Sequence, residues 1–492
     1  MDARPNRAYP HKWMYRLAVA AVAVFLILTP KTSLGQDRED VEREAGPPTL
    51  PATAAGNQLM WVLKVVNGQE IGDLKDHFSD RFIQTRGDDT KVLLEGLRQE
   101  VFEGGKVIVN KVLDGEREND ISAEVTSKES WRYLHVFLMV DEKDGKIRGL
   151  RFAPAGGVGR NVGNWKQFDN AMNRVPEGVS FGAYELVPVN PNVEGSPLTM
   201  RVLAENGADR RLNVGATGYL YVVGAAAEEV AGKRMGWDDK VALKPEWNSL
   251  PPGEMRAMEG EHALREFVLR VMDDSDNTAA DHLLHHVGRD KVEAYLAKMH
   301  LAAERNQPFL SSREVFALKT GKDKEMLAKF GVAGVEERRG MLAKVAALPL
   351  TEDAAEEWTD PTEIERVGWF ASATECCRVM MDLHRLTQKE GMEPLSEALE
   401  SNRGVKLSQE LWPRAWYKGG DEPGVLNMTW LLERDDGRLF VMSIGWNNPK
   451  GEVKEARLLD LALAAIRLLG EEGRKREPAP APRPKVDPNA AN

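Results

Sequence analysis

The chain has 492 residues, of which 42% are hydrophobic and 29% charged, and it contains 12 Trp. This composition is typical of folded proteins, and the length predicts more than one domain. The formal net charge of −11 argues against a general nucleic-acid or anionic-membrane binder.

The first 35 residues have the pattern of a signal peptide. Basic residues come first, an apolar run follows at 17–28, and the small residues Ser33 and Gly35 precede Gln36. Because the apolar run is too short to span a bilayer comfortably, we expect cleavage, export and no stable membrane span afterwards. The expected location is periplasmic or secreted, and a retained N-terminal anchor is the alternative.

A small domain is expected after a linker. Residues 36–56 are charged and then Pro/Ala-rich, which favours a linker, and residues 57–155 have the pattern of a compact α+β unit. Helices are predicted over 58–68 and 89–102, and strands over 106–113, 120–127 and 131–154. The last strand pattern folds back on an Asp144-Gly145 turn. Helices followed by a meandering sheet favour a cone-shaped sheet of the steroid-isomerase or NTF2-like kind.

A Gly-rich stretch near 153–165 marks the boundary of a second domain, over 166–470. Strand patterns at 179–188 and 197–214 come before long helical patterns that extend to about residue 400. Two strands joined at Asp436-Gly437 follow, and a last helix stops at Gly470. This order predicts an α+β fold whose antiparallel sheet is built from both ends of the domain, with a helical lobe between. The Pro-rich tail at 471–492 is predicted to be disordered.

Three short stretches of the second domain are best interpreted together. The stretch "VGATGYLYVV" is predicted to form a Gly-containing turn and a helix that starts near Ala216. Ser275, Asp276 and Asn277 precede a helical pattern, and "KGG" at Lys418 begins a strand pattern. A lone Ser-Asp-Asn is more typical of a helix N-cap, and a lone "KGG" is weaker still. Their occurrence together, in this order, indicates one site.

These stretches resemble the class A β-lactamases, of the penicillin-binding-protein fold, over roughly residues 180–470. That family carries S-x-x-K at a helix start, S-D-N in the helical lobe and K-T-G or K-S-G on a strand. With the preceding α+β unit, the arrangement resembles the β-lactamase-like proteins of clavulanic-acid gene clusters. Those proteins pair a steroid-isomerase-like domain with this fold.

The resemblance implies serine acyl transfer, with β-lactam or peptidoglycan-like ligands. Ser275 would relay protons, Asn277 would orient the substrate, and the Lys418 ammonium would bind a substrate carboxylate. The backbone N–H groups of Ala216 and Asp421 would polarise the substrate carbonyl. The implied substrate-binding residues are Lys418, Gly419, Gly420 and Asp421. Gly419 departs from the family's threonine or serine and loses a hydroxyl that would contact the carboxylate.

The family's nucleophile and base are missing. The S-x-x-K pattern falls on Ala216 and Tyr219, so that serine is replaced by alanine and lysine by tyrosine, and no serine of the chain has a lysine three positions later. Removing such a nucleophile costs on the order of a millionfold in turnover. We therefore expect a catalytically impaired pseudoenzyme. No equivalent of the family's deacylating glutamate is identified near 311–331.

Weaker signals favour packing. Adjacent Cys376 and Cys377 lie in a helical pattern, and we expect one buried and one half-exposed thiol. His282 and His286 have an i, i+4 spacing that can hold zinc, but no glutamate follows the first histidine, so structural roles are favoured, as they are for His77 and His135. No phosphate-binding or dinucleotide motif occurs, and no cofactor or metal is expected.

Three functional hypotheses remain open. The first is an exported, catalytically impaired member of the β-lactamase-like serine hydrolases that binds ligands without acylation. The second is an active β-lactamase or serine hydrolase with a rearranged nucleophile, Ser275 or Tyr219. The third is a non-enzymatic envelope binding protein that uses the N-terminal cone. Oligomeric state and ligand identity are not determined by the sequence.

Overall fold

A computed structural model describes residues 49–474, apart from 98, 100, 101, 103, 115–117, 128–132, 157–161, 176, 177, 302 and 303. The expected signal segment, most of the expected linker, part of the Gly-rich boundary and the tail beyond 474 lie outside the described residues. The chain divides into two compact units, and the second comprises Asn161–Glu472. In the described part of the chain, no helix is both long and apolar enough to cross a membrane.

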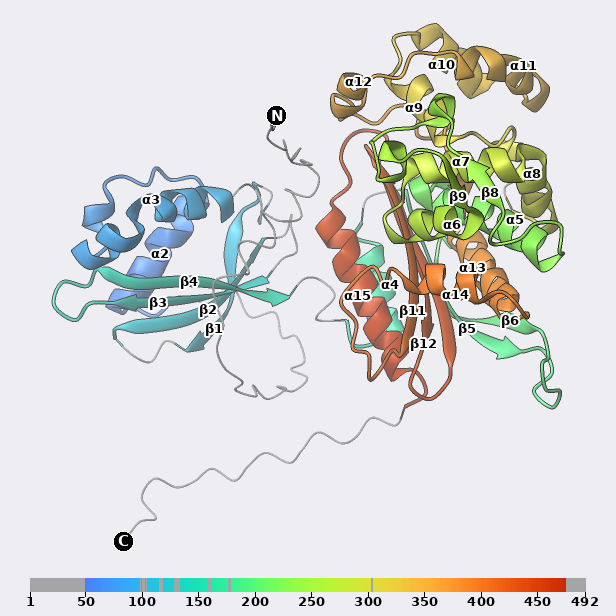
Figure 1. Cartoon of the computed structure of the whole chain (residues 1–492). Helices are drawn as coiled ribbons and strands as arrows, with labels where there is room; N and C mark the ends of the chain where they lie inside the picture. Colours follow the sequence, from blue (N-terminus) through green and yellow to red (C-terminus); the bar gives the residue numbers. More distant parts are fainter. Residues whose placement is uncertain are drawn as a thin grey trace, which may run out of the picture. The chain divides into compact units, whose positions relative to one another are not determined.

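The first unit combines helices with a four-stranded antiparallel sheet (Figure 1). Its elements are α2 (Ala54–Val66), η1 (Leu74–Asp76), α3 (Asp80–Gly96), β1 (Val107–Asp114), β2 (Asp120–Ser127), β3 (Tyr133–Val140) and β4 (Ile147–Gly156). The strands pair in chain order, as a meander does. The turn between β3 and β4 places Gly145 at a φ of 66°, a backbone conformation that glycine adopts without steric cost.

Helix α2 packs its apolar face on this sheet. Leu59 and Val62 are fully buried in the same core as sheet residues of β2 and β3. His77 stacks on Trp61 with ring centroids 3.8 Å apart, and its Nδ1 lies 3.0 Å from the Gln58 side-chain oxygen. His77 is therefore engaged in packing at the edge of this core.

The second unit contains a five-stranded antiparallel sheet in the order β11-β12-β13-β5-β6. Its strands are β5 (Val179–Pro188), β6 (Leu198–Asn206), β11 (Arg414–Glu422), β12 (Val425–Glu433) and β13 (Leu439–Asn447). β5 and β6 come from the start of the unit and the other three from its end, so the prediction of a sheet assembled from both ends is confirmed. β11 forms one edge of the sheet.

A helical lobe lies between these two groups of strands in the sequence (Figure 1). Its elements are β7 (Leu212–Asn213), η4 (Gly215–Gly218), α5 (Tyr219–Ala231), β8 (Lys240–Ala242), η5 (Pro245–Trp247), η6 (Met255–Ala257), β9 (Glu261–Ala263), α6 (Leu264–Asp273), α7 (Asn277–Val287), α8 (Arg289–Lys298), η7 (Glu304–Asn306), α9 (Ser312–Thr320), α10 (Lys324–Val332), α11 (Val335–Ala346), α12 (Glu352–Glu356), β10 (Phe370–Ala371), α13 (Ala373–Thr387) and α14 (Glu393–Glu400). Two further helices, α4 (Trp165–Met172) and α15 (Glu455–Glu471), pack against each other and against the sheet.

Both cysteines are buried, which corrects the expectation of one half-exposed thiol. They lie on α13, which packs against β13 and β5 on one side and against α5 on the other. Because both sides of the helix are covered, neighbouring positions are removed from water together. Burial raises the pKa of the Cys376 thiol to about 12, so this thiol stays protonated at neutral pH.

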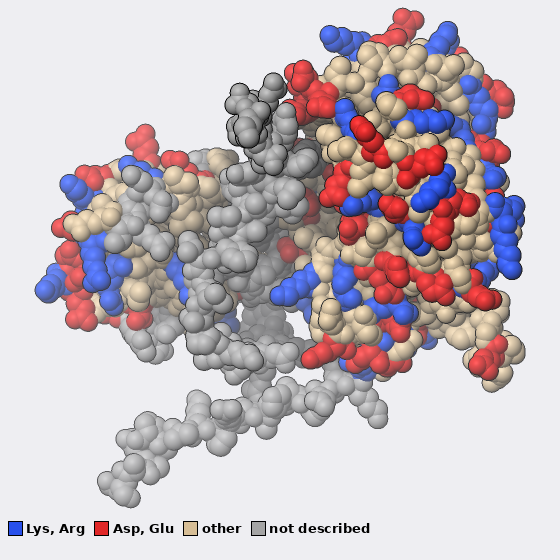
Figure 2. All heavy atoms as spheres, viewed as in Figure 1, with Lys and Arg blue, Asp and Glu red and all other residues tan. Residues whose placement is uncertain are grey.

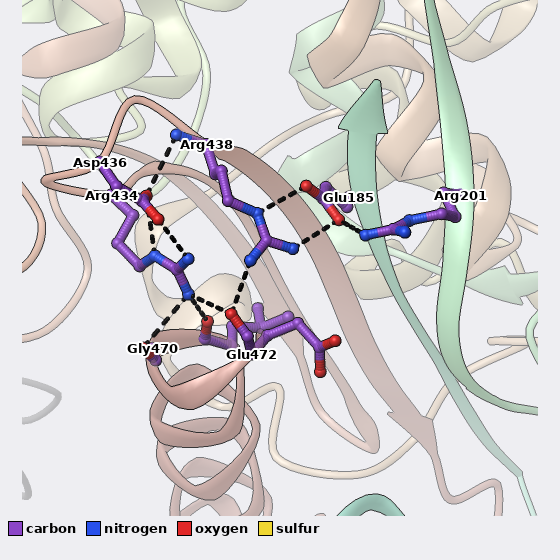
Figure 3. Close-up of polar contacts among 8 residues, drawn as sticks. Glu185, Arg201, Arg434, Asp436, Arg438, Gly470 and Glu472 are labelled. Carbon is purple, nitrogen blue, oxygen red and sulfur yellow. Dashed lines mark hydrogen bonds and ion pairs between the residues drawn. The ribbon is translucent and has the colours of Figure 1, made fainter. Parts of the chain in front are cut away.

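Arg434 anchors the C-terminal end of α15 to the β12–β13 hairpin (Figure 3). Its guanidinium binds both carboxylate oxygens of Asp436, at 2.9 and 2.5 Å. It also donates to the carbonyls of Leu469, Gly470 and Glu472, at 3.1, 3.3 and 2.8 Å. Carbonyls at a helix C-terminus have no partner within the helix, and Arg434 supplies one.

Arg438 links the end of α15 to strand β5 of the sheet (Figure 3). It donates to the Glu472 carbonyl at 2.6 Å and forms two bonds of 2.7 Å with the Glu185 carboxylate on β5. Arg201 on β6 contacts the same carboxylate. On the face of the molecule shown in Figure 2, acidic and basic side chains of the described residues are similarly intermixed.

Candidate functional site

The turn that carries Ala216 packs directly against the edge strand β11. Gly215 has a φ of 51°, and a Cβ built on it would lie 2.7 Å from the backbone nitrogen of Asp421. A Cβ on Gly420 would in turn lie 2.5 Å from the backbone nitrogen of Ala216. Glycine at both positions therefore permits the close approach of two backbone segments. The two amides expected to polarise a carbonyl come from these segments.

Ser275 lies in the short connection between α6 and α7. Its φ of 58° is in the left-handed region that non-glycine residues rarely adopt. The cap of α7 is Asp276, whose carboxylate accepts from the Ala279 amide at 2.9 Å and from the Met255 amide at 2.9 Å. The aspartate thus performs the capping role that the motif suggested, which leaves the Ser275 hydroxyl available for other contacts.

Lys418 reaches from β11 to this serine. It lies in the middle of the strand and not at its start, as the sequence pattern had suggested. Its ammonium donates to the Ser275 hydroxyl at 2.5 Å and to the Gly419 carbonyl at 3.0 Å. Burial lowers the pKa of Lys418 to about 8, while Asp421 and Asp274 oppose this shift.

Tyr219 is the residue at which the resemblance placed the family's lysine. Its hydroxyl donates to the Asn277 side-chain oxygen at 2.5 Å, and the Asn277 amide donates to the Leu250 carbonyl at 2.5 Å. The ring packs edge-on against Trp369, and the Lys418 ammonium lies 5.6 Å from its centroid. Burial raises the pKa of Tyr219 well above 10, so the phenol is neutral and acts as a hydrogen-bond donor.

Gly419 is explained by its neighbour on the same strand. A Cβ at this position would overlap the Tyr417 hydroxyl. The Tyr417 ring also lies against Gly404, where a side chain would overlap it. A threonine at 419 is therefore incompatible with the observed position of Tyr417.

Every site residue expected from the sequence lies in one region of the second unit. Hydrogen bonds join Lys418 to Ser275 and Tyr219 to Asn277, and close backbone approach joins the Ala216 turn to Gly420 and Asp421. The chemistry available is binding by an ammonium, hydroxyls and backbone amides. At the turn, Ala216 offers no hydroxyl, and the adjacent Thr217 is buried, with its hydroxyl 3.5 Å from the Lys418 carbonyl.

The sequence did not indicate a buried carboxylate that is linked to Asn277 through the Ser312 hydroxyl. Asp281 on α7 accepts from the Ser312 amide and hydroxyl, both at 2.6 Å, and from the Arg313 amide at 2.8 Å. Burial raises its pKa to about 7, against the effect of these donors. The Ser312 hydroxyl also contacts the Asn277 carbonyl at 3.0 Å. The only available signal was the four-residue spacing between Asn277 and Asp281 on one helix.

Glu314, in the region searched for a deacylating glutamate, has a structural role. It completes a capping box with Ser311 and forms an ion pair of 2.9 Å with Arg289. Of the two histidines with the i, i+4 spacing, for which structural roles were expected, His282 has such a role. His282 is buried, donates from Nδ1 to the Thr278 carbonyl and accepts at Nε2 from the Lys244 amide. Among the described residues, no group of three or more His, Cys, Asp or Glu is arranged to hold a metal ion.

Comparison with known proteins identifies the family. The model of the β-lactamase enzyme family matches residues 199–458, which is more than half of the chain. The chain therefore belongs to the β-lactamase enzyme family. No curated protein matches the sequence.

The solved structures that this chain matches are distant in sequence. A β-lactamase from Sphaerobacter thermophilus has 17% identity and a TM-score of 0.40, covering 62% of this chain and 96% of that one. A β-lactamase from Chitinophaga pinensis has 12% identity and a TM-score of 0.40, covering 62% and 97%. The protein PBP-A has 12% identity and a TM-score of 0.38, covering 62% and 95%.

Proposed function

We propose that this chain is an exported β-lactamase-family protein that binds β-lactam or peptidoglycan-like ligands and does not hydrolyse them. The observation that carries the proposal is the pair of residues Ala216 and Tyr219 at the positions of the family's serine and lysine, where the Tyr219 phenol donates to Asn277. A neutral, buried phenol is a poor nucleophile and a poor base. Covalent hydrolysis by the family's route then has neither of the groups that it needs.

Retained binding is supported by the Lys418 ammonium. Its acceptors are neutral oxygens of Ser275 and Gly419, and among the described residues it forms no ion pair. A ligand carboxylate would supply the missing anion, and charge-assisted hydrogen bonds of this kind are the stronger ones. The ligand class proposed is therefore a carboxylate-bearing β-lactam or peptide.

Export and an NTF2-like N-terminal domain belong to the same proposal. Export is supported by the basic, apolar and small-residue order of residues 1–35. The NTF2-like fold is supported by two helices on a four-stranded antiparallel sheet. The alternative of an envelope binding protein that uses this domain alone stays a hypothesis.

A second candidate function is favoured by one distance. The Lys418 nitrogen lies 2.5 Å from the Ser275 hydroxyl, and a lysine with a lowered pKa is the base of a serine–lysine pair. In this route Ser275 Oγ attacks the lactam carbonyl carbon and its proton moves to neutral Lys418. The C–N bond breaks as Lys418 returns that proton to the leaving nitrogen, which leaves an acyl ester on Ser275.

One experiment separates the two candidates. The mature protein is incubated with penicillin G and with a chromogenic cephalosporin, and intact mass, turnover and equilibrium binding are measured. Saturable binding with unshifted mass and no turnover supports the leading proposal. An adduct mapped to Ser275, absent from Ser275→Ala, supports the second. The matched control is the double variant Ala216→Ser/Tyr219→Lys, which restores the family pattern and is expected to acylate at the restored serine only if the remaining site is intact.

A further inference from the structure

A buried asparagine joins the two segments that carry the site's backbone amides. Asn213 precedes the turn, is 1% exposed and accepts at its side-chain oxygen from the Gly215 amide at 3.0 Å. Its side-chain nitrogen donates to the Glu422 carboxylate at 2.7 Å. Glu422 directly follows Asp421 on β11. One amide side chain therefore contacts the turn before Ala216 and the strand residue after Asp421.

The Glu422 carboxylate is held from a third direction by Lys319. This lysine lies on α9, its side chain is fully buried, and it forms an ion pair with Glu422. Asn447 on β13 fixes the backbone of Asn213: its side chain accepts from the Asn213 amide at 2.8 Å and donates to the Asn213 carbonyl at 2.9 Å. The helical lobe, the turn and the sheet thus meet at Asn213 and Glu422.

These side-chain contacts of Asn213 and Glu422 bear on how the turn is held against β11. Glycine at 215 and 420 leaves no side chain at the closest approach of the turn to β11, and the Thr217 hydroxyl reaches the Lys418 carbonyl only at 3.5 Å. At Gly368, a Cβ would lie 2.5 Å from the Asn213 side-chain nitrogen, so glycine there leaves room for the amide group. The position of the Ala216 and Asp421 amides is consequently fixed by contacts at the ends of the two segments.

We propose that Asn213, Glu422 and Lys319 are positioning residues that hold the Ala216 and Asp421 amides together as a binding site for a carbonyl oxygen or a small oxyanion. This inference rests on the proposed ligand binding. Its consequence is that loss of the nucleophile leaves the carbonyl-polarising part of the site in place. The bound lactam carbonyl accepts two backbone N–H bonds but is not attacked at the turn.

The test exchanges the donor and acceptor between two residues. Asn213→Asp keeps the acceptor for Gly215 but removes the donor to Glu422 and places two carboxylates together. Glu422→Gln keeps an acceptor for Asn213 but removes the charge that faces Lys319. The double variant Asn213→Asp/Glu422→Gln reverses the direction of the central hydrogen bond and restores one negative charge beside Lys319. Arg434→Met is the matched control, because it destabilises the same unit away from the site.

Two readouts are measured for each variant. The first is amide hydrogen exchange, without ligand, of the peptides that contain Ala216 and Asp421. The second is the infrared stretching frequency and the Kd of penicillin G labelled with ¹³C at the lactam carbonyl. We expect Asn213→Asp to speed exchange at both peptides, to move the carbonyl frequency back towards its value in water and to weaken binding about tenfold, the equivalent of one or two hydrogen bonds. The double variant should recover all three.

Unchanged exchange at both peptides in Asn213→Asp would overturn the inference, as would an equal loss of affinity in Arg434→Met. If penicillin G fails to bind the unmodified protein, the proposed function is overturned. The exchange measurement then still decides whether Asn213 positions the two amides, so the two failures are distinguishable.

Discussion

Arg434 and Lys418 are two cations buried to the same degree in one unit, each 1% exposed, with opposite surroundings. Arg434 binds the Asp436 carboxylate and three carbonyls at the end of α15. Lys418 donates to a hydroxyl and one carbonyl and, in the described part of the chain, has no ion-pair partner. One cation is paired with an anion by the fold, and the other is left without a direct anionic partner.

The difference follows from the chemistry of the two side chains. Arginine stays protonated at any ordinary pH, so burial forces the fold to provide an anion and acceptors. Lysine can release its proton, and burial lowers the pKa of Lys418 to about 8. Arg434 therefore completes the structure, whereas the role proposed for Lys418 is to bind a ligand anion.

The largest effect on the free energy of unfolding is expected for Arg434, the cation that the fold pairs with a carboxylate. Arg434→Met removes its hydrogen bonds to the Leu469, Gly470 and Glu472 carbonyls at the end of α15. Arg438 still donates to the Glu472 carbonyl, so the link between the helix and the hairpin is weakened and not abolished. Losing charge-assisted hydrogen bonds to these carbonyls costs on the order of 3 kcal/mol. Urea unfolding should show this loss, with penicillin affinity unchanged in the folded protein. A loss below about 1 kcal/mol would show that water or other groups replace the arginine.

Lys418→Met removes the cation that has no direct anionic partner among the described residues. Since no anion among the described residues contacts this lysine directly, we expect the free energy of unfolding to stay the same or to rise. Affinity for penicillin G should fall about 10- to 100-fold, the value of a hydrogen bond to a charged group. Penicillin G methyl ester, which lacks the carboxylate, is the matched ligand and should bind both proteins equally. Equal loss for acid and ester would contradict the assigned role.

The pH dependence of penicillin affinity tests whether the charge of Lys418 binds the ligand. Because the pKa of Lys418 is about 8 in the folded protein, its charge is lost as the pH rises through 8. Penicillin affinity should therefore fall about tenfold between pH 7 and pH 9 and stay flat in Lys418→Met. The unfolded chain keeps this proton to about pH 10.4, so the lysine's contribution to stability rises with pH in that window. Asp421 and Asp274 are the carboxylates that oppose the lowering of the Lys418 pKa.

The smallest effect is expected at Asp436. Arg434 lowers the pKa of Asp436 to about 2, but 42% of this side chain is exposed, and water screens the pair. Asp436→Asn should cost about 1 kcal/mol or less at pH 7. The depressed pKa means that the contribution is fully present above about pH 4 and is lost as the pH falls through about 2. Unfolding curves of the two proteins should therefore converge as the pH is lowered over this range.

Local sequence signals predicted the elements of the second unit well. The Asp436-Gly437 turn predicted the β12–β13 hairpin. The Gly-containing turn predicted a helix start near Ala216, where the structure has the 3₁₀ turn η4, and α5 itself begins at Tyr219. Such signals succeed because turns, caps and periodic apolar faces act over a few residues of chain. For the same reason they placed Lys418 incorrectly at the start of its strand, whose first residues carry no turn signal.

These local signals did not predict contacts between residues that are far apart in the sequence. The exposure of one of the two cysteines was expected from their helix alone, yet the sheet and α5 cover both sides of that helix. Gly419 was interpreted as a lost hydroxyl, and the structure shows that Tyr417 occupies the space. Each of these outcomes depends on which surfaces face each other, and that is not encoded in spacing along one element.

The sequence by itself determined the residue types of this candidate site: Ala216 and Tyr219 where the resemblance places the family's serine and lysine, and Ser275, Asn277 and Lys418 at the other expected positions. Tertiary structure alone decided their partners. It gave Lys418 two neutral acceptors, and it placed Asn213 between the turn and β11. The physical reason is that charge balance and hydrogen bonding in a buried site depend on groups from many elements, which only packing brings within hydrogen-bond distance.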